Sequence, residues 1–252
     1  MLSVAPLRPY RHSETTEGET MKTIGIIGGL GPESTLAYYR TIIAACNTGA
    51  TPLASPEIII HSSSLNELLT LIDRSAWEEI TDWLLARIDS LHRAGAEFVA
   101  IASNTPHIVF DRLANRSPLP LISIVAETVR EAQQLGVKRI GLLGTRLTMA
   151  SDLYRTPFEE AGMTVHTPTA PEQERIHQLL FTEIELGIIK ESTRDELLAM
   201  IQRLEEKEGI EALILGCTEL PLILPDQGFG IPFLDTAAIH CRAIVARCLG
   251  EA

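Results

Sequence analysis

The chain repeats its own pattern once, and this internal repeat constrains the fold more than any other feature of the sequence. Lys22 aligns with Lys138, Gly95 with Gly209 and Pro120 with Pro232, in the same order and at a nearly constant offset. Any two halves of an α/β protein share some alternation of strands and helices. Three matches in the same order nevertheless favour a true repeat and predict two similar lobes. The matched segments are KTIGIIGG at 22–29 with KRIGLLGT at 138–145, GAEFVAIASN at 95–104 with GIEALILGCT at 209–218, and PLIS at 120–123 with PFLD at 232–235.

Both halves alternate short apolar runs with amphipathic stretches of helical period. This alternation predicts an α/β fold with parallel sheets covered on both faces, as two lobes related by a pseudo-two-fold axis. The helical stretches include 76–94 and 195–208. The expected strands are 23–27, 57–60, 98–102, 121–124, 139–143, 163–166, 212–215 and 232–234.

The order of these elements predicts the limits of the lobes. Residues 1–20 are polar, contain proline and show neither periodicity nor the apolar stretch of a signal peptide, so we interpret them as a disordered extension or an upstream-start artefact. The predicted N-lobe comprises 21–119 plus 228–252, and the predicted C-lobe comprises 120–227.

Composition excludes several classes of partner. The net charge of −12 argues against nucleic acid, which demands a basic face, and no apolar run reaches the ~18 residues of a membrane span. Any acidic ligand needs a local Arg or Lys. The four cysteines form no CxxC pair, which is typical of a reduced, cytoplasmic protein, and Cys241 and Cys248 are expected to be core residues. The scattered histidines include no HExxH motif, so we expect no metal.

Two polar segments follow equivalent strands of the repeat. Ser103, Asn104 and Thr105 follow one strand, and Cys217, Thr218 and Glu219 follow its counterpart. Because ligands of such folds bind at the carboxyl ends of strands, Ser103 and Cys217 are expected to approach one inter-lobe cleft from opposite sides. Two proton-handling groups on opposite faces of one carbon would suit stereoinversion.

The chemistry of these two positions differs. Cys217 precedes an apparent helix start, which would lower the pKa of its thiol and supply thiolate at neutral pH, although a buried structural cysteine is the alternative. The Ser103 hydroxyl is a much weaker acid and has no adjacent base. His107, four residues further on, is expected either to relay a proton to Ser103 or to satisfy a helix end.

The loop after the first strand contains Gly29, Leu30 and Gly31. As a dinucleotide-binding motif it lacks the third glycine and an acidic residue about 20 positions further on. The loop fits a site in which backbone N–H groups bind a carboxylate better than it fits a dinucleotide site. The alternative is that the glycines are required only for a tight turn.

Three motifs together resemble the aspartate/glutamate racemase family. They are MKTIGIIGGLGP at 21–32, SNTPH at 103–107 and GCTEL at 216–220, and the resemblance extends over residues 21–252. It implies two flavodoxin-like lobes, a homodimer, no cofactor, and two thiols that remove and return the α-proton on opposite faces.

The chain departs from the family pattern at two places. Ser103 occupies the first thiol position, and HSSSLNEL at 61–68 lacks the arginine that binds substrate carboxylate in typical aspartate racemases. LGTRLTM at 143–149 and LDTAAIH at 234–240 are closer to L-aspartate/glutamate-specific racemases with threonine at the first thiol position. This resemblance implies substrate binding by Thr145 and by Arg175, for which an exposed helix arginine is the alternative.

These observations give one principal hypothesis and three rivals. Cys217 thiolate removes the α-proton of L-aspartate or L-glutamate and the Ser103 side returns one. Arg175 and the Gly29–Gly31 loop hold carboxylates, and Asn104, Thr105 and Thr218 stabilise the developing charge. The rivals are a single-thiol decarboxylase or isomerase of malonate- or maleate-like diacids, a non-catalytic protein that binds acidic amino acids, and, last, an NAD-dependent oxidoreductase.

Overall fold

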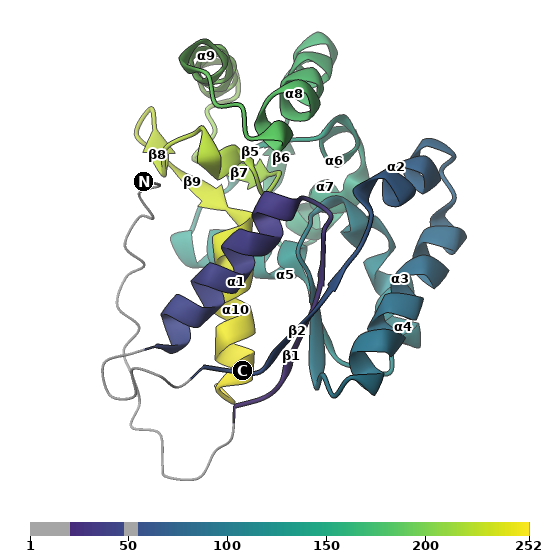
Figure 1. Ribbon diagram of the computed structural model, residues 1–252. Helices are drawn as coiled ribbons and strands as arrows, with labels where there is room; N and C mark the ends of the chain where they lie inside the picture. The colour runs from purple at the N-terminus through teal and green to yellow at the C-terminus, as the bar shows by residue number, and fades with distance from the viewer. Residues whose placement is uncertain (1–20, 48–54, 252) are drawn as a thin grey trace.

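The computed structural model describes residues 21–47 and 55–251 (Figure 1). The extension predicted at 1–20 lies outside these residues. Within the described ranges, no helix is both long and apolar enough to cross a membrane.

The first lobe is built on a four-stranded parallel sheet of order β2-β1-β3-β4. Every residue of β1 and β3 is buried, because helices cover both faces of the sheet. The strands are β1 (Ile24–Gly28), β2 (Ile58–Ser62), β3 (Phe98–Ile101) and β4 (Leu121–Ile122). The helices between them are α1 (Pro32–Cys46), α2 (Leu65–Asp73), α3 (Trp77–Arg93), the 3₁₀ helix η1 (Thr105–Val109) and α4 (Phe110–Arg116).

The second lobe repeats this arrangement. Its sheet has the order β6-β5-β7-β9-β8, in which β6, β5, β7 and β9 are parallel and β8 is an antiparallel edge. The strands are β5 (Arg139–Gly144), β6 (Thr164–His166), β7 (Ala212–Gly216), β8 (Gln227–Gly228) and β9 (Ile231–Asp235). The helices are α5 (Ile124–Leu135), α6 (Arg146–Ala150), α7 (Asp152–Glu160), α8 (Ala170–Thr182), α9 (Glu191–Glu208), α10 (Thr236–Cys248), and the 3₁₀ helices η2 (Ile184–Leu186) and η3 (Leu220–Leu222).

The matching strand orders confirm the predicted α/β fold with parallel sheets in two lobes. All eight predicted strands are present, and β8 is an additional one. The helix predicted at 76–94 is α3, whose buried stripe of Ile80, Leu84, Ile88 and Leu91 recurs at helical spacing.

The two lobes exchange their last helices. α5 follows β4 of the first sheet but contributes Ile124, Val125 and Ala132 to the core of the second lobe. α10 follows β9 of the second sheet but packs beside α1 in the core of the first lobe (Figure 1). The predicted boundaries are therefore wrong for two strands: β4 pairs in the first sheet and β9 in the second. The prediction kept each strand with the helix that follows it, whereas the chain crosses between lobes after the strand.

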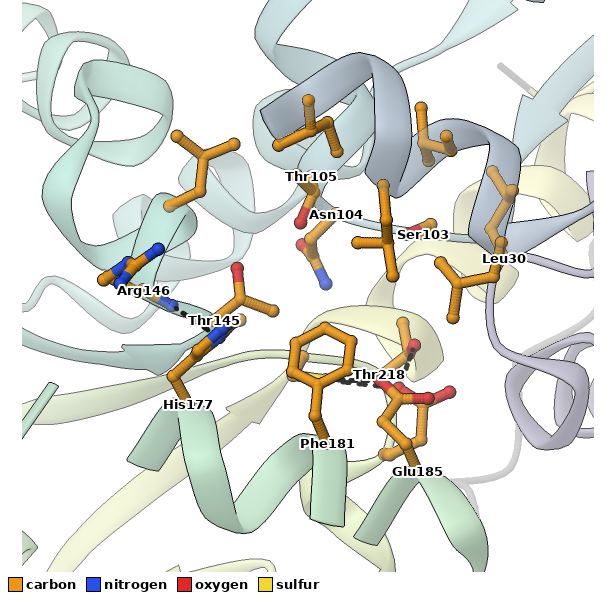
Figure 2. Close-up of a pocket in the computed structure, with 18 of the residues that line it drawn as sticks. Leu30, Ser103, Asn104, Thr105, Thr145, Arg146, His177, Phe181, Glu185 and Thr218 are labelled. Carbon is orange, nitrogen blue, oxygen red and sulfur yellow. Dashed lines mark hydrogen bonds between the residues drawn. The ribbon is translucent and has the colours of Figure 1, made fainter. Parts of the chain in front are cut away.

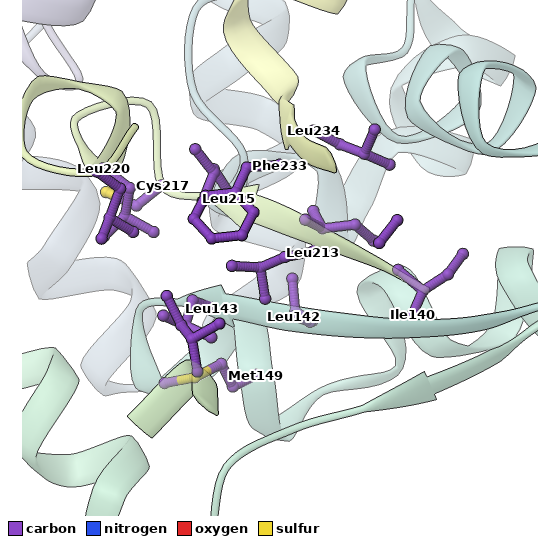
Figure 3. Packing of buried hydrophobic residues seen from close by; sticks show 14 of the residues in the cluster. Ile140, Leu142, Leu143, Met149, Leu213, Leu215, Cys217, Leu220, Phe233 and Leu234 are labelled. Atoms are coloured by element: carbon purple, nitrogen blue, oxygen red, sulfur yellow. The ribbon is translucent and has the colours of Figure 1, made fainter. Parts of the chain in front are cut away.

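The core of the second lobe extends to the carboxyl end of β7. Leu213 and Leu215 of β7 pack among Leu142, Leu143 and Phe233, and Cys217 lies beside Leu220 at one end of this cluster (Figure 3). The thiol at this position directly follows a buried strand and is largely shielded from solvent, with 6% of its residue surface exposed.

Candidate active site

A cavity of about 270 Å³ lies where the carboxyl ends of the two sheets meet. This volume is slightly below the range of pockets that hold drug-sized ligands, so it suits a ligand of amino-acid size. Figure 2 shows Ser103, Asn104 and Thr105 on one side and Phe181, Glu185 and Thr218 on the other. Of the predicted site residues, those that line the cavity are Leu30, Ser103, Asn104, Thr105, Thr145, Cys217, Thr218 and Glu219.

Cys217 follows β7 and directs its thiol toward carboxylates. The thiol donates to Glu219 Oε2 at 3.2 Å and lies 3.6 Å from Glu185 Oε1. Burial, followed by the negative charges of Glu219 and Glu185, raises the pKa of the Cys217 thiol well above its usual range. The predicted lowering of this pKa is wrong, because the three-residue η3 that follows offers little helix dipole and, among the residues that the structure describes, carboxylates rather than cations act on the thiol.

Glu219 is buried within the site, with 2% of its surface exposed. Its Oε2 accepts hydrogen bonds from the thiol and, at 2.8 Å, from the Thr218 hydroxyl, whereas Oε1 has no partner among the described residues. Burial raises the pKa of Glu219, and the bonds from Thr218 and Cys217 oppose this rise. Two donors at one oxygen fit an ionised Glu219.

Glu185 of η2 is the second carboxyl beside the thiol, and the sequence analysis missed it. Burial, followed by the charge of Glu219, raises the pKa of Glu185 to about 8. At neutral pH we therefore assign the proton of the pair to Glu185 and the charge to Glu219. Nothing in the spacing of the sequence marks Glu185, which precedes Cys217 by 32 positions.

The same three side chains bring three groups that can ligate a cation close together. Ligand atoms of Glu185, Cys217 and Glu219 all lie within 4.8 Å of one another. A thiolate with two carboxylates is a donor set that suits Zn²⁺, although binding would require loss of the thiol proton.

Ser103 lies at the end of β3, equivalent to the position of Cys217 after β7. Its side chain lines the cavity, and within the described ranges its hydroxyl makes no hydrogen bond to another side chain. His107 does not reach this hydroxyl: its Nδ1 donates to the Ser103 carbonyl at 2.9 Å, and its Nε2 accepts from the Ile124 N–H at 3.3 Å. Burial lowers the pKa of His107 to about 4. The proposed relay is therefore not formed, and His107 satisfies backbone groups instead.

Hydroxyl and amide groups connect the lobes beside Ser103. Asn104 is held on both sides of its amide, since its Nδ2 donates to Thr236 at 3.1 Å and its Oδ1 accepts from the Tyr154 hydroxyl at 2.5 Å. Thr148 Oγ1 lies 3.3 Å from Thr105 Oγ1 and 3.0 Å from Thr145 Oγ1. These hydrogen bonds fix polar groups from both lobes at one edge of the cavity.

The glycine loop contributes less than the sequence suggested. Leu30 lines the cavity, but the Gly29 N–H donates to Thr35 Oγ1 at 2.8 Å and is not free for a carboxylate. Gly31 has φ 141°, and a Cβ there would lie 2.3 Å from Glu219 Oε1. Glycine at position 31 is required by this close approach and by its backbone conformation.

Arg175 does not reach the cavity. It lies on the exposed side of α8, where its guanidinium binds both carboxylate oxygens of Glu196 at 2.8 and 2.9 Å. The implied substrate-binding role is therefore not supported, and the exposed helix arginine is what we observe. The arginine that lines the cavity is Arg146, beside Thr145, and it forms an ion pair with Glu174 at 3.0 Å.

Part of the cavity lining is an apolar wall. Leu65, Leu68, Leu69 and Ile72 recur at helical spacing on one face of α2 and line the cavity. Leu68 is buried, and the other three are partly exposed. Leu30, Leu147 and Phe181 extend this wall.

Two parallel α/β lobes, with a thiol and a hydroxyl at equivalent strand ends of one shared cavity, define a two-lobed protein of the racemase type. Residues 27–244 match the Asp/Glu/hydantoin racemase family. The chain belongs to this family, whose members are isomerases.

Individual relatives agree with this assignment. The broad specificity amino-acid racemase RacX of Bacillus subtilis is 25% identical over 233 residues, which cover 90% of this chain and 98% of that protein. The structure of an aspartate racemase homologue from Pyrococcus horikoshii matches with a TM-score of 0.78 and 37% identity, over 90% of this chain and 99% of the other. The aspartate racemase of Picrophilus torridus shares the fold, with a TM-score of 0.75, 21% identity, and coverage of 92% and 95%.

Proposed function

We propose that this protein is a cofactor-independent amino-acid racemase in which Cys217 exchanges the α-proton. The observation that carries the proposal is the placement of Cys217 and Ser103 at equivalent strand ends on one cavity. The family supports amino-acid racemase activity, and the residue roles below are our inference from the geometry.

The polar edge of the cavity would hold the α-carboxylate of the substrate. Asn104 is fixed by two hydrogen bonds, and the hydroxyls of Thr105 and Thr145 are held through Thr148. Groups held in this way bind charge that develops on the carboxylate as the α-carbon loses its proton, without reorganising at that moment.

Glu185 would bind the α-ammonium. It lies 3.6 Å from the Cys217 thiol, so a substrate whose α-carbon contacts that thiol brings its ammonium within reach of Glu185. A positive charge there lowers the pKa values of Glu185 and of the thiol. Thiolate would then form on binding, with Glu219 accepting the thiol proton across 3.2 Å.

Proton transfer then occurs on the two faces of the α-carbon. The Cys217 thiolate takes the α-proton, the electron pair of the C–H bond delocalises into the α-carboxylate, and a proton returns from the Ser103 hydroxyl or a water beside it. The alkoxide or hydroxide left on that side is reprotonated from solvent, and Glu219 releases to solvent the proton that it took from the thiol. Because the two faces carry groups of different acidity, exchange should start more readily from the L-enantiomer, which presents its α-proton to Cys217.

The resemblance to aspartate/glutamate racemases implies acidic substrates, with Arg175 and the Gly29–Gly31 loop as the groups that hold their carboxylates. Since Arg175 pairs with Glu196 outside the cavity, the side-chain class must be chosen from the lining of the cavity itself. A malonate-like diacid would require the same lining to bind two carboxylates. For this reason we rank racemization above decarboxylation.

The test is incubation with L- and D-amino acids in D₂O, with the α-proton followed by NMR and the products resolved by chiral chromatography. We expect loss of the α-proton together with appearance of the opposite enantiomer. CO₂ release from a substituted malonate without α-exchange would favour the decarboxylase, and saturable binding of amino acids without exchange would favour a binding protein.

A further inference from the structure

The cavity carries more negative than positive charge. Among the described residues that line it, Arg146 is the permanent cation, and it is already paired with Glu174. Three acidic residues, Asp73, Glu185 and Glu219, also line it. Burial, followed by the charge of Arg146, lowers the pKa of His177, so this imidazole adds no charge near neutral pH.

Both carboxylates of a diacid substrate would therefore share one cation of the described lining, and that cation is already paired with Glu174. Arg146 follows Thr145 directly and lies at the polar edge that suits the α-carboxylate. A second carboxylate, on the substrate side chain, would meet either the acidic groups or the leucines of α2. Removing a carboxylate from water without a partner is strongly unfavourable.

The apolar wall instead offers a surface for a hydrocarbon side chain. Leu65, Leu69 and Ile72 line the cavity and are partly exposed. Phe181 enters the cavity from α8 in the other lobe (Figure 2). With the α-carboxylate at the threonine edge and the ammonium at Glu185, this wall is the direction that remains for the side chain.

We propose that the preferred substrates are amino acids with aliphatic side chains, such as leucine, rather than aspartate or glutamate. This inference rests on the proposed racemase function and names its substrate class. Each buried methylene-sized group favours binding by about fourfold, so leucine should be preferred over alanine by roughly 50-fold in kcat/KM.

The test compares L-leucine, L-alanine, L-lysine, L-aspartate and L-glutamate in the deuterium-exchange assay. We expect leucine to exceed aspartate and glutamate by about tenfold or more. Exchange of aspartate or glutamate as fast as that of leucine would overturn the inference on substrate class but not the racemase proposal. Lysine as the best substrate would have the same consequence. If no amino acid exchanges, the racemase proposal fails, and calorimetry then decides the substrate class: binding of leucine but not aspartate supports it, and any other result rejects it.

Two variants distinguish the loss of a side-chain contact at the apolar wall from a general loss of stability. Leu69→Ser should lower kcat/KM for leucine by about tenfold and change that for alanine less than twofold, because alanine does not reach the wall. Leu135→Ser, at an exposed leucine outside the cavity, should change neither. Equal losses for leucine and alanine in Leu69→Ser would contradict a side-chain wall.

Discussion

Replacing Glu219 by glutamine should make Cys217 more reactive and the enzyme less active. Glu219 Oε2 accepts the thiol proton at 3.2 Å, and its charge raises the pKa of that thiol. Unit charges at this separation interact by about 1 kcal/mol in water and about 5 kcal/mol at an effective dielectric constant of about 20. Because about 1.4 kcal/mol corresponds to one pKa unit, even the lower limit gives a fall of roughly one unit.

The expected results have opposite signs in two assays. At pH 7.5, iodoacetamide should label Cys217 of Glu219→Gln about tenfold faster than in the wild type, because more thiolate is present. Deuterium exchange of the substrate should fall by roughly 100-fold or more, because the acceptor of the thiol proton is gone. Labelling is read from the mass of the Cys217 peptide across pH 6 to 10, so the other cysteines do not interfere.

Glutamine has the shape of the carboxylate and keeps an oxygen to accept from Thr218, so we expect the variant to fold. Glu159→Gln, at an exposed glutamate of α7, is the matched control and should leave both rates unchanged. An unchanged or raised thiol pKa in Glu219→Gln, or exchange at the wild-type rate, would refute the assignment of Glu219 as the proton acceptor.

Three further outcomes follow from the structure. Burial lowers the pKa values of His107 and His240 to about 4 and about 3, below an unfolded value of about 6.5, so each imidazole should cost about 2 kcal/mol of stability by pH 5 relative to pH 7.5. Glu185, whose pKa is raised to about 8, favours folding over the same fall in pH, so chemical denaturation is carried out on Glu185→Gln, and equal stability of this variant at pH 7.5 and pH 5 would contradict the prediction. Ser103→Cys should bring the initial exchange rates from L- and D-substrate closer together, as seen by NMR from each enantiomer; an unchanged ratio would argue against proton return from this side. Micromolar Zn²⁺ should inhibit by binding the thiol of Cys217 and the two carboxylates beside it, with recovery after EDTA, and protection of this thiol from labelling distinguishes the site from surface binding.

The fold was largely predictable because its signals are local. Apolar runs that end in small or polar residues mark buried parallel strands, and the repeat doubled each signal. The two-residue β8 offers no such run, and the exchange of α5 and α10 between lobes depends on packing that no local pattern records. The predicted boundaries therefore fail at β4 and β9.

The candidate site was predictable only where it is built from strand ends. Cys217 and Ser103 follow strands directly, so sheet geometry brings them to one cavity. Glu185 and the leucines of α2 come from helices whose orientation is set by tertiary contacts. Arg175 illustrates the same limit, because a partner 21 positions further on, Glu196, holds it at the surface.

The central claim is that Cys217 handles the α-proton. The most direct test is single-turnover deuterium exchange with Cys217→Ser beside Cys46→Ser, which changes a buried cysteine outside the cavity. The account predicts that Cys217→Ser binds substrate but loses exchange by roughly 100-fold or more, while Cys46→Ser exchanges at the wild-type rate. Full exchange by folded Cys217→Ser would contradict the account.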